Sequence, residues 1–271
     1  MIFQTAAKIN LNLKIYPLNK GERLHNLESD MVPISLFDTI SIEESDVDEI
    51  LFNKGELNGI ESTLHTSLRL MREANPEFVT KFKIYVEKNI PHGAGLGSGS
   101  SNAGGLINFL SSQYGLKTPN YIDIANNIGS DVPFFVNNKP AKISGVGDII
   151  TDINLDKVDE LLLAVPKLHI NTGGVFKAFD KRVEQGVVNK TKAYFSNDLW
   201  EAAIEVEPKL GQKQQELNKH FNKEFVMSGS GSSFFAPIDN IEYLESEIEK
   251  LDLQLFSICK KIDSCFFPIS D

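Results

Sequence analysis

Apolar and polar side chains alternate without interruption near the start of the chain, in the segment AAKINLNLKIYPL. Alternation with a period of two is typical of a strand that has one buried and one solvated face. One side of the predicted strand carries Ile9, Leu11, Leu13 and Ile15, and the other carries Lys8, Asn10, Asn12 and Lys14. We therefore expect the second set to lie together on the wet face of a sheet.

The same kind of pattern predicts the remaining elements. Alternating or continuous apolar runs predict strands within residues 38–53, 81–90, 131–136, 140–150, 160–166, 224–238 and 253–262. Apolar residues at helical spacing predict helices within residues 61–75, 101–115, 118–129, 172–183, 197–204, 208–221 and 241–251. Gly115 is expected to end the second of these helices, and the third is expected to have Thr118 as its cap, Pro119 as its first residue and Gly129 at its end.

The order of these elements indicates two units. Residues 1–152 hold the glycine-rich strand-to-helix connection and most of the predicted strands. Residues 153–271 mix strands and helices as a smaller α+β unit. The length of 271 residues suits one large domain or two modest ones.

Composition and charge exclude several classes of protein. The formal net charge is −10, which disfavours binding to nucleic acid or to an anionic membrane surface. No apolar run is long enough to span a membrane, and the first residues lack the charged and apolar regions of a secretion signal. The two cysteines, Cys259 and Cys265, are too few for a disulfide framework, so we expect a cytoplasmic protein.

The segment NIPHGAGLGSGSSNAGG, residues 89–105, holds six glycines and joins a predicted strand to a predicted helix. Glycines allow backbone N–H groups to approach an anion, and the helix behind them adds the positive end of its dipole. Ser98, Ser100 and Ser101 add hydroxyl groups, one of which is a candidate to help hold a magnesium ion. The segment lacks the lysine of a Walker A loop and is only a weak match to a dinucleotide fingerprint. The pattern therefore fits a phosphate cradle, or a tight turn that binds no ligand.

Three segments together resemble the motifs of the GHMP kinases, the superfamily of the galactokinase, homoserine, mevalonate and phosphomevalonate kinases. PHGAGLGSGSSNA is similar to the signature P-x-x-x-G-L-G-S-S-S-A, with Gly99 where serine is usual. GSDVPFF is similar to the superfamily's G-A-D-V-P-F-F segment, and SGSGSSFFA is similar to its third motif. The resemblance implies a two-lobed α/β (α+β) kinase fold. Its N-terminal lobe would be ribosomal-S5-domain-2-like and its C-terminal lobe ferredoxin-like.

The resemblance also implies that ATP, together with Mg²⁺, binds at the glycine-rich segment. The residues that it assigns to ATP are Lys88, Pro91, Gly93, Gly95, Leu96, Gly97, Ser98, Gly99, Ser100 and Ser101. No histidines, cysteines or carboxylates are spaced as direct metal ligands, so no protein metal site is expected. By pattern alone Lys88 is equally well an edge-strand charge.

Further segments resemble one group of the superfamily, the 4-diphosphocytidyl-2-C-methyl-D-erythritol kinases of the non-mevalonate isoprenoid pathway. They are AAKINLNLKI, HNLESDMVPISLFDTI, SGVGDIIT and FSNDLWEAA. The resemblance implies phosphorylation of the 2-hydroxyl of that cytidine-diphosphate-linked methylerythritol. The residues that it assigns to this substrate are Asn10, His25, Thr172, Phe176, Gly229 and Ser230.

Two positions depart from the pattern of that group. Leu24 stands where the group has a tyrosine beside the cytosine, and Thr63 replaces an asparagine that lies toward the adenosine. We expect both changes to affect affinity more than chemistry. By pattern alone His25 is a surface histidine and Phe176 is a core residue.

The resemblance assigns the chemical step to Asp131 and Lys8. Asp131 would act as the general base that takes the proton of the attacking hydroxyl. Lys8 would stabilise the developing alkoxide and keep the carboxylate ionised. Unaided pattern instead favours a turn aspartate and a solvated lysine at these two positions.

Two alternative functions stay open at this point. One is another GHMP kinase that acts on a small alcohol such as mevalonate or homoserine, and the other is a non-catalytic nucleotide-binding homologue. In each case the partners are small molecules, with neither nucleic acid nor membrane. The chain is expected to be a monomer or a homodimer.

Overall fold

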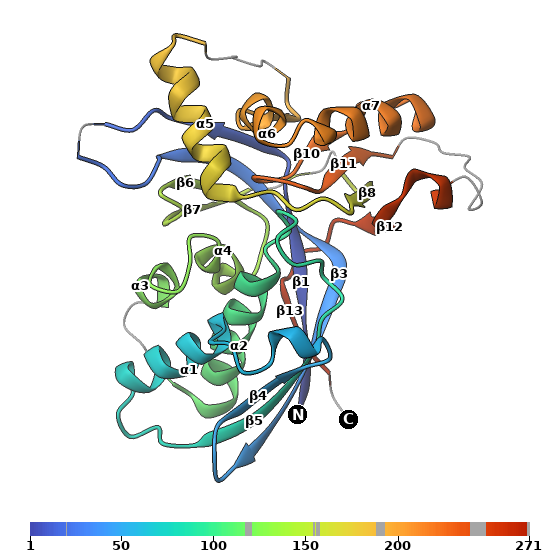
Figure 1. The fold of residues 1–271 in the computed structure, drawn as a ribbon. Helices are drawn as coiled ribbons and strands as arrows, with labels where there is room; N and C mark the ends of the chain where they lie inside the picture. The colour runs from blue at the N-terminus through green and yellow to red at the C-terminus, as the bar shows by residue number, and fades with distance from the viewer. Residues whose placement is uncertain are drawn as a thin grey trace.

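The computed structural model describes residues 1–19, 21–116, 121–153, 155, 158–187, 193–238 and 248–269 of the chain. Within this part the strands form one nine-stranded sheet and one four-stranded sheet. Figure 1 shows helices grouped against each sheet, as the predicted α+β character requires. No helix in these ranges is both long and apolar enough to cross a bilayer.

The larger sheet is built around two long strands that run antiparallel to each other (Figure 1). Its members are β1 (Ile2–Asn10), β2 (Asn12–Ile15), β3 (Leu27–Ser45), β4 (Glu49–Phe52), β5 (Lys81–Glu87), β6 (Ala141–Gly145), β7 (Ile149–Asp152), β9 (Ser196–Asn197) and β13 (Phe266–Ile269). β13 pairs with β1, and β9 pairs in parallel with β2. Residues from the end of the chain therefore complete a sheet that begins at Ile2. The division of the chain at residue 152 stays a prediction.

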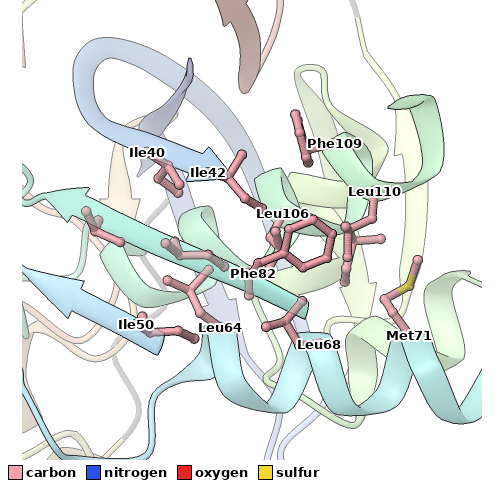
Figure 2. Packing of buried hydrophobic residues seen from close by; sticks show 14 of the residues in the cluster. Ile40, Ile42, Ile50, Leu64, Leu68, Met71, Phe82, Leu106, Phe109 and Leu110 are labelled. Carbon is pink, nitrogen blue, oxygen red and sulfur yellow. The ribbon is translucent and has the colours of Figure 1, made fainter. Parts of the chain in front are cut away.

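Helices α1 (Thr63–Ala74), α2 (Ser98–Tyr114), α3 (Tyr121–Asn126) and α4 (Val132–Asn137) pack beside this sheet. Figure 2 shows the core between them, where Phe82 of β5 lies among Leu64 and Leu68 of α1 and Leu106 of α2. A short 3₁₀ turn, η1 (Gly55–Leu57), follows β4. The predicted alternation of β5 is confirmed, since Phe82, Ile84 and Val86 are fully buried and every residue between them is exposed.

The smaller sheet has the order β10 (Val226–Met227), β11 (Phe234–Pro237), β8 (Glu160–Pro166) and β12 (Leu253–Lys260), and its strands are antiparallel. Three helices cover it: α5 (Thr172–Glu184), α6 (Trp200–Val206) and α7 (Lys209–Phe221). η2 (Glu249–Leu251) precedes β12. Together they confirm the strands predicted within residues 160–166, 224–238 and 253–262 and the helices predicted within residues 172–183, 197–204 and 208–221, whereas β9 and β13 were not predicted.

Besides β3, which begins at Leu27 rather than near residue 38, two predicted elements differ from the structure. Residues 131–136 were expected to form a strand, whereas residues 132–137 form helix α4. Four consecutive apolar residues of this segment are buried, so burial on all sides removes the periodicity that separates a helix from a strand. The third predicted helix ends at Asn126 rather than at Gly129, while its proposed start at Thr118 and Pro119 lies outside the described residues. The helix predicted at 241–251 lies largely outside them too, and η2 is its described part.

The expectation that Lys8, Asn10, Asn12 and Lys14 share a wet face is wrong. Asn10 lies opposite Met31 on β3, so a regular ladder would place Lys14 opposite Leu27, but Lys14 lies opposite Glu28. This shift of one residue at Leu11 moves the polar side chains of β2 to the other face of the sheet. In addition, Lys8 and Asn10 are only 3% and 5% exposed. The two residues assigned to the site are thus enclosed rather than solvated.

Candidate active site

A lysine and a carboxylate meet where β1 approaches the start of α4. Lys8 Nζ lies 3.4 Å from Asp131 Oδ2 and 2.5 Å from Asn10 Oδ1. The Lys8 side chain is 4% exposed, whereas that of Asp131 is 39% exposed. The structure therefore brings Lys8, Asn10 and Asp131 together, with a buried cation on one side of a carboxylate that stays accessible on the other.

Hydrogen bonds to three distant segments of the chain hold Lys8 and Asn10 in place. The Lys8 N–H donates to the Leu96 carbonyl at 3.0 Å. The Asn10 amide Nδ2 donates to Ser29 Oγ at 2.8 Å, and the Asn10 N–H donates to Ser228 Oγ at 3.2 Å. Asn10 therefore has its own partners on both sides, which fixes the amide oxygen that contacts Lys8 Nζ.

The glycine-rich loop lies directly against Lys8. Gly97, the N-cap of α2, has φ +72°, and a Cβ at this position would lie 2.8 Å from the Phe135 ring and 3.1 Å from Lys8 Cγ. A Cβ on Gly95, at φ +75°, would lie 2.3 Å from the Ser228 carbonyl oxygen. The three motifs found in the sequence therefore converge on one point, and close approach of the backbone explains why glycine stands at both positions.

The three serines of the loop do not share one environment. Ser98 Oγ donates to the Ile90 carbonyl at 3.3 Å, and Ser101 Oγ donates to the Ala6 carbonyl at 2.6 Å. Both side chains are buried. Ser100 is partly exposed and faces Gly129, where an added Cβ would lie 3.8 Å from Ser100 Oγ. Of the three hydroxyls, that of Ser100 is thus the one without a main-chain acceptor among the described residues.

Gly99 and Thr63, the two residues near the loop that depart from the family pattern, contact each other. Thr63, the first residue of α1, donates its hydroxyl to the Gly99 carbonyl at 2.8 Å. A Cβ on Gly99 would meet Thr63 Oγ1 at 3.6 Å, which is ordinary contact. The position can therefore accept the more usual serine without displacing α1, and the Gly99 departure leaves the loop conformation intact.

Lys88 lies beneath the loop. Its ammonium group bonds to the Asp38 carboxylate, to Asn102 Oδ1 at 2.8 Å and to the Ser98 carbonyl at 3.4 Å. Burial lowers the pKa of Lys88, and the charge of Asp38 opposes that shift. This geometry gives Lys88 a structural role, and its predicted contact with ATP stays a prediction.

Asp38 was not predicted as part of this region. Its side chain is fully buried, and Oδ1 accepts the N–H groups of Asn89 and Ile90 at 2.8 and 2.9 Å. Together with Lys88 and Asn102, Asp38 joins the entrance of the loop to the first turns of α2. The sequence signal was weak, because one aspartate among the polar positions of a long strand looks solvated.

His25 and Phe176 come together on the far side of the site. Their rings stack with centroids 5.2 Å apart and planes 28° from parallel. His25 Nδ1 donates to the Tyr16 carbonyl at 2.9 Å, and Nε2 lies 3.1 Å from Asp180 Oδ1. Both ring nitrogens of His25 are thus engaged within the protein, while the neighbouring Leu24 is 61% exposed. Asp180 was missed, although it lies one helical turn after Phe176 on the same face of α5.

Of the residues assigned to the substrate, Thr172, Gly229 and Ser230 connect the His25–Phe176 stack to the Lys8–Asp131 pair. Thr172, the first residue of α5, has its hydroxyl 2.8 Å from that of Ser230. A Cβ on Gly229 would lie 3.4 Å from both Lys8 Nζ and Asn10 Oδ1. Of the other assigned loop residues, Pro91 and Leu96 are buried, and Gly93 lies beside the His169 ring. Helix α5 therefore reaches the Lys8–Asp131 pair through the glycine turn of the third motif.

We expect Gly97→Ala to weaken the binding of an ATP analogue by about tenfold or more, a loss of roughly 1.4 kcal/mol. The reason is that the new methyl group displaces Phe135 and Lys8, which lie within 3.1 Å of its position. Gly115→Ala is the matched control, because Gly115 caps the other end of α2 at φ +60° and has nothing within 4 Å of its Cβ position. Calorimetric titration of both variants, with melting curves to verify folding, makes the test. Equal affinities for the two would contradict a nucleotide cradle at Gly97.

Comparison with known proteins adds a family context to this geometry. The family model described as the GHMP kinases N terminal domain matches residues 62–139. A protein of Methylacidiphilum infernorum named 4-diphosphocytidyl-2-C-methyl-D-erythritol kinase is 32% identical, over 85% of this chain and 83% of its own length. A protein of the same name from Fusobacterium nucleatum subsp. nucleatum is 28% identical, over 95% of this chain and 96% of its own.

Solved structures show the same fold. The crystal structure of a 4-(cytidine 5'-diphospho)-2C-methyl-D-erythritol kinase superimposes with a TM-score of 0.76 at 24% identity, covering 96% of this chain and 99% of the other. A mevalonate kinase structure superimposes with a TM-score of 0.60 at 19% identity, covering 97% of this chain and 100% of the other. The predicted GHMP kinase fold is confirmed.

Proposed function

Since the chain belongs to the family of 4-diphosphocytidyl-2-C-methyl-D-erythritol kinases, within the GHMP kinases, we propose that it transfers the γ-phosphoryl group of ATP to the 2-hydroxyl of 4-diphosphocytidyl-2-C-methyl-D-erythritol. The observation that carries the proposal is the contact between buried Lys8 and accessible Asp131 beside the glycine-rich loop. Solvated surface ion pairs carry little significance alone, whereas this pair has one enclosed partner and lies beside a glycine loop at a helix N-terminus, a place that favours anions.

The catalytic pair suits the deprotonation of an alcohol. The Asp131 carboxylate would accept the proton of the attacking hydroxyl, and the Lys8 ammonium would stabilise the negative charge that develops on its oxygen. Because Lys8 is largely removed from water, its charge acts at short range through a medium of low dielectric constant. Phosphoryl transfer needs mainly positioning and charge stabilisation, which this arrangement supplies.

The loop would hold the phosphates of ATP through its backbone. Gly93, Gly95 and Gly97 all have positive φ, and α2 begins at the next residue, Ser98. The first N–H groups of a helix have no partner within the helix, and the dipole favours an anion there. Since α2 has 17 residues, its dipole is fully developed. The loop and helix together thus suit a triphosphate.

The residues present also fit Mg²⁺, which in kinases is usually bound by substrate phosphates, water and one or two protein oxygens. No group of three or more histidine, cysteine or acidic side chains able to hold a metal occurs in the described part of the chain. Ser100 Oγ, the loop hydroxyl without a main-chain acceptor among the described residues, is the protein oxygen that we assign to this ion. When bound, Mg²⁺ would neutralise phosphate charge during transfer.

The His25–Phe176 stack is the proposed contact for cytosine. If it reads the base, free methylerythritol phosphate should be a much poorer substrate than the cytidylyl compound. Base–aromatic stacking is worth about 1–3 kcal/mol, so kcat/KM should differ roughly 10-fold to 100-fold from this source alone.

Phe176→Ala should remove most of that difference. Phe37→Ala is a matched control, because Phe37 is also half-buried and packs on another aromatic ring, Phe267, in the larger sheet. Steady-state kinetics with both substrates measures the ratio. Equal kcat/KM for the two substrates in the unaltered protein would indicate a kinase for another small alcohol. A cytoplasmic location and a monomeric or homodimeric state remain further predictions.

A further inference from the structure

The two-residue strand β9 carries an asparagine whose side chain is committed entirely to main-chain partners. Asn197 Nδ2 donates to the carbonyl oxygens of Met227 and Gly229, at 2.8 and 2.7 Å. Its Oδ1 accepts the Leu199 N–H at 2.9 Å. The residue is buried, so each of these bonds forms away from bulk water. Asn197 therefore binds the third glycine motif at two carbonyls, one on each side of Ser228.

The turn that Asn197 binds lies next to the catalytic lysine. Gly229 is close enough to Lys8 Nζ and Asn10 Oδ1 that an added Cβ would contact both at 3.4 Å. The preceding residue, Ser228, accepts the Asn10 N–H at 3.2 Å and donates to the Gly95 carbonyl at 3.2 Å. A displacement of this turn would therefore be felt by Lys8, by Asn10 and by the phosphate loop.

Asn197 is also anchored to the strand that follows the catalytic residues. Leu13 of β2 pairs with Asn197, and the N–H of the next residue, Asp198, donates to the Leu13 carbonyl at 2.9 Å. The Asp198 carboxylate accepts the Ile15 N–H at 3.0 Å. The backbone of β9 thus moves with β2, while the Asn197 side chain holds the turn.

We infer that Asn197 is a positioning residue for phosphoryl transfer, which fixes the turn around Gly229 against Lys8 and Asn10. The expected effect on catalysis rests on the proposed function. The expected effect on the turn around Gly229 rests only on the hydrogen bonds of Asn197. The carbonyl oxygens of Met227 and Gly229 both accept from one side chain, and the primary amide of Asn197 has the two N–H donors that this requires. Asn197 touches neither reacting group, so it acts through the turn.

Asn197→Asp tests this role with little change of shape. The carboxylate has no donor for the carbonyls of Met227 and Gly229, and it places negative charge beside both oxygens. We expect the turn to move away from Lys8, and kcat in single-turnover phosphoryl transfer to fall about 10-fold to 100-fold, because small misplacements are costly in positioned reactions. The KM for ATP should change less than threefold, about 0.65 kcal/mol, because Gly97 at the start of α2 lies against Phe135 and Lys8 rather than against this turn.

The control is Asn58→Asp. Asn58, the exposed C-cap of η1, makes similar bonds to the edge strand β4: its Oδ1 accepts the Phe52 N–H at 2.8 Å, and its Nδ2 donates to the Phe52 carbonyl at 3.4 Å. A merely structural loss should lower the melting temperature in both variants without a specific change in kcat. Asn197→Asp with unchanged kcat, or an equal fall in kcat in both variants, would overturn the inference.

Hydrogen exchange gives a readout that does not depend on activity. Amides of residues 226–233 should exchange faster in Asn197→Asp than in the unaltered protein, and at the unaltered rate in Asn58→Asp. If the unaltered protein fails to phosphorylate the cytidylyl substrate, the proposed function fails, and exchange alone decides whether Asn197 holds the turn. Unchanged exchange in Asn197→Asp would refute the positioning role. If Asn197→Asp does not fold, Asn197→Ser, which keeps one donor, replaces it. We expect the same direction of change in kcat, and about half of the loss of protection against hydrogen exchange.

Discussion

Asp131→Asn is expected to lower the rate of phosphoryl transfer by about 10²–10⁴-fold, the usual contribution of general-base assistance. The amide keeps the size of the carboxylate but cannot accept the hydroxyl proton. ATP binding should stay near that of the unaltered protein, because the glycine loop contacts Lys8 and Phe135 rather than this side chain. The effect should therefore appear in kcat and not in nucleotide affinity.

Single-turnover transfer to the cytidylyl substrate is the measurement, with Lys8→Met and the double variant beside it. If Lys8 and Asp131 act on one proton transfer, as proposed, the double variant should be less impaired than the product of the two single defects. Asp152→Asn is the control, since Asp152 forms an exposed pair with Lys139 at 2.6 Å and should leave kcat unchanged. Turnover of Asp131→Asn at the unaltered rate would make Asp131 only a helix-start residue.

Lys88→Met is expected to lower the free energy of unfolding by about 3–5 kcal/mol, as removal of one partner of a buried ion pair typically does. The substitution leaves the Asp38 carboxylate fully buried and without its cation. Asn102 Nδ2 and the N–H groups of Asn89 and Ile90 would still bond to Asp38, but they carry no net charge. The penalty is thus one of desolvated charge rather than of lost packing, since methionine retains most of the lysine stem.

Equilibrium denaturation by urea measures this change. Lys139→Met is the matched control, because Lys139 belongs to an exposed lysine–aspartate pair whose loss should change stability by less than about 1 kcal/mol. The loop rests on Asp38 and Lys88, so folded Lys88→Met should also bind an ATP analogue more weakly. A stability loss as small as that of Lys139→Met would show that the buried pair does not support the fold.

Local sequence patterns were sufficient for much of this architecture. The alternation of β5, the glycine segment and the stop at Gly115 each depend on a few neighbouring residues, and each was predicted. Helix α4 was missed because its apolar side chains are enclosed on all sides. The shift at Leu11 was missed because the pattern continues through it unbroken, and only the pairing with β3 sets the register.

Site residues that belong to a sequence motif could be predicted. Residues whose role depends on partners far along the chain could not. Lys8 and Asp131 were placed by resemblance, while their burial and their contact with Asn10 required the fold. Asp38 meets Asn89 across 51 positions of sequence, and Asn197 meets Met227 across 30. A buried polar residue of this kind has no local period or motif, since its role depends on which carbonyl or N–H group the chain brings to it.

The pairing of β13 with β1 sets an order of events during synthesis on the ribosome. Phe3 of β1 packs against Phe266 of β13, so one flank of the strand that carries Lys8 is supplied by residues made some 260 positions later. Until those residues leave the exit tunnel, the nascent chain presents an open strand edge beside an unfinished active site. Contacts this distant along the sequence slow folding, because the loop they close is long. A nascent chain stalled before Phe266 would therefore keep that edge of β1 unpaired.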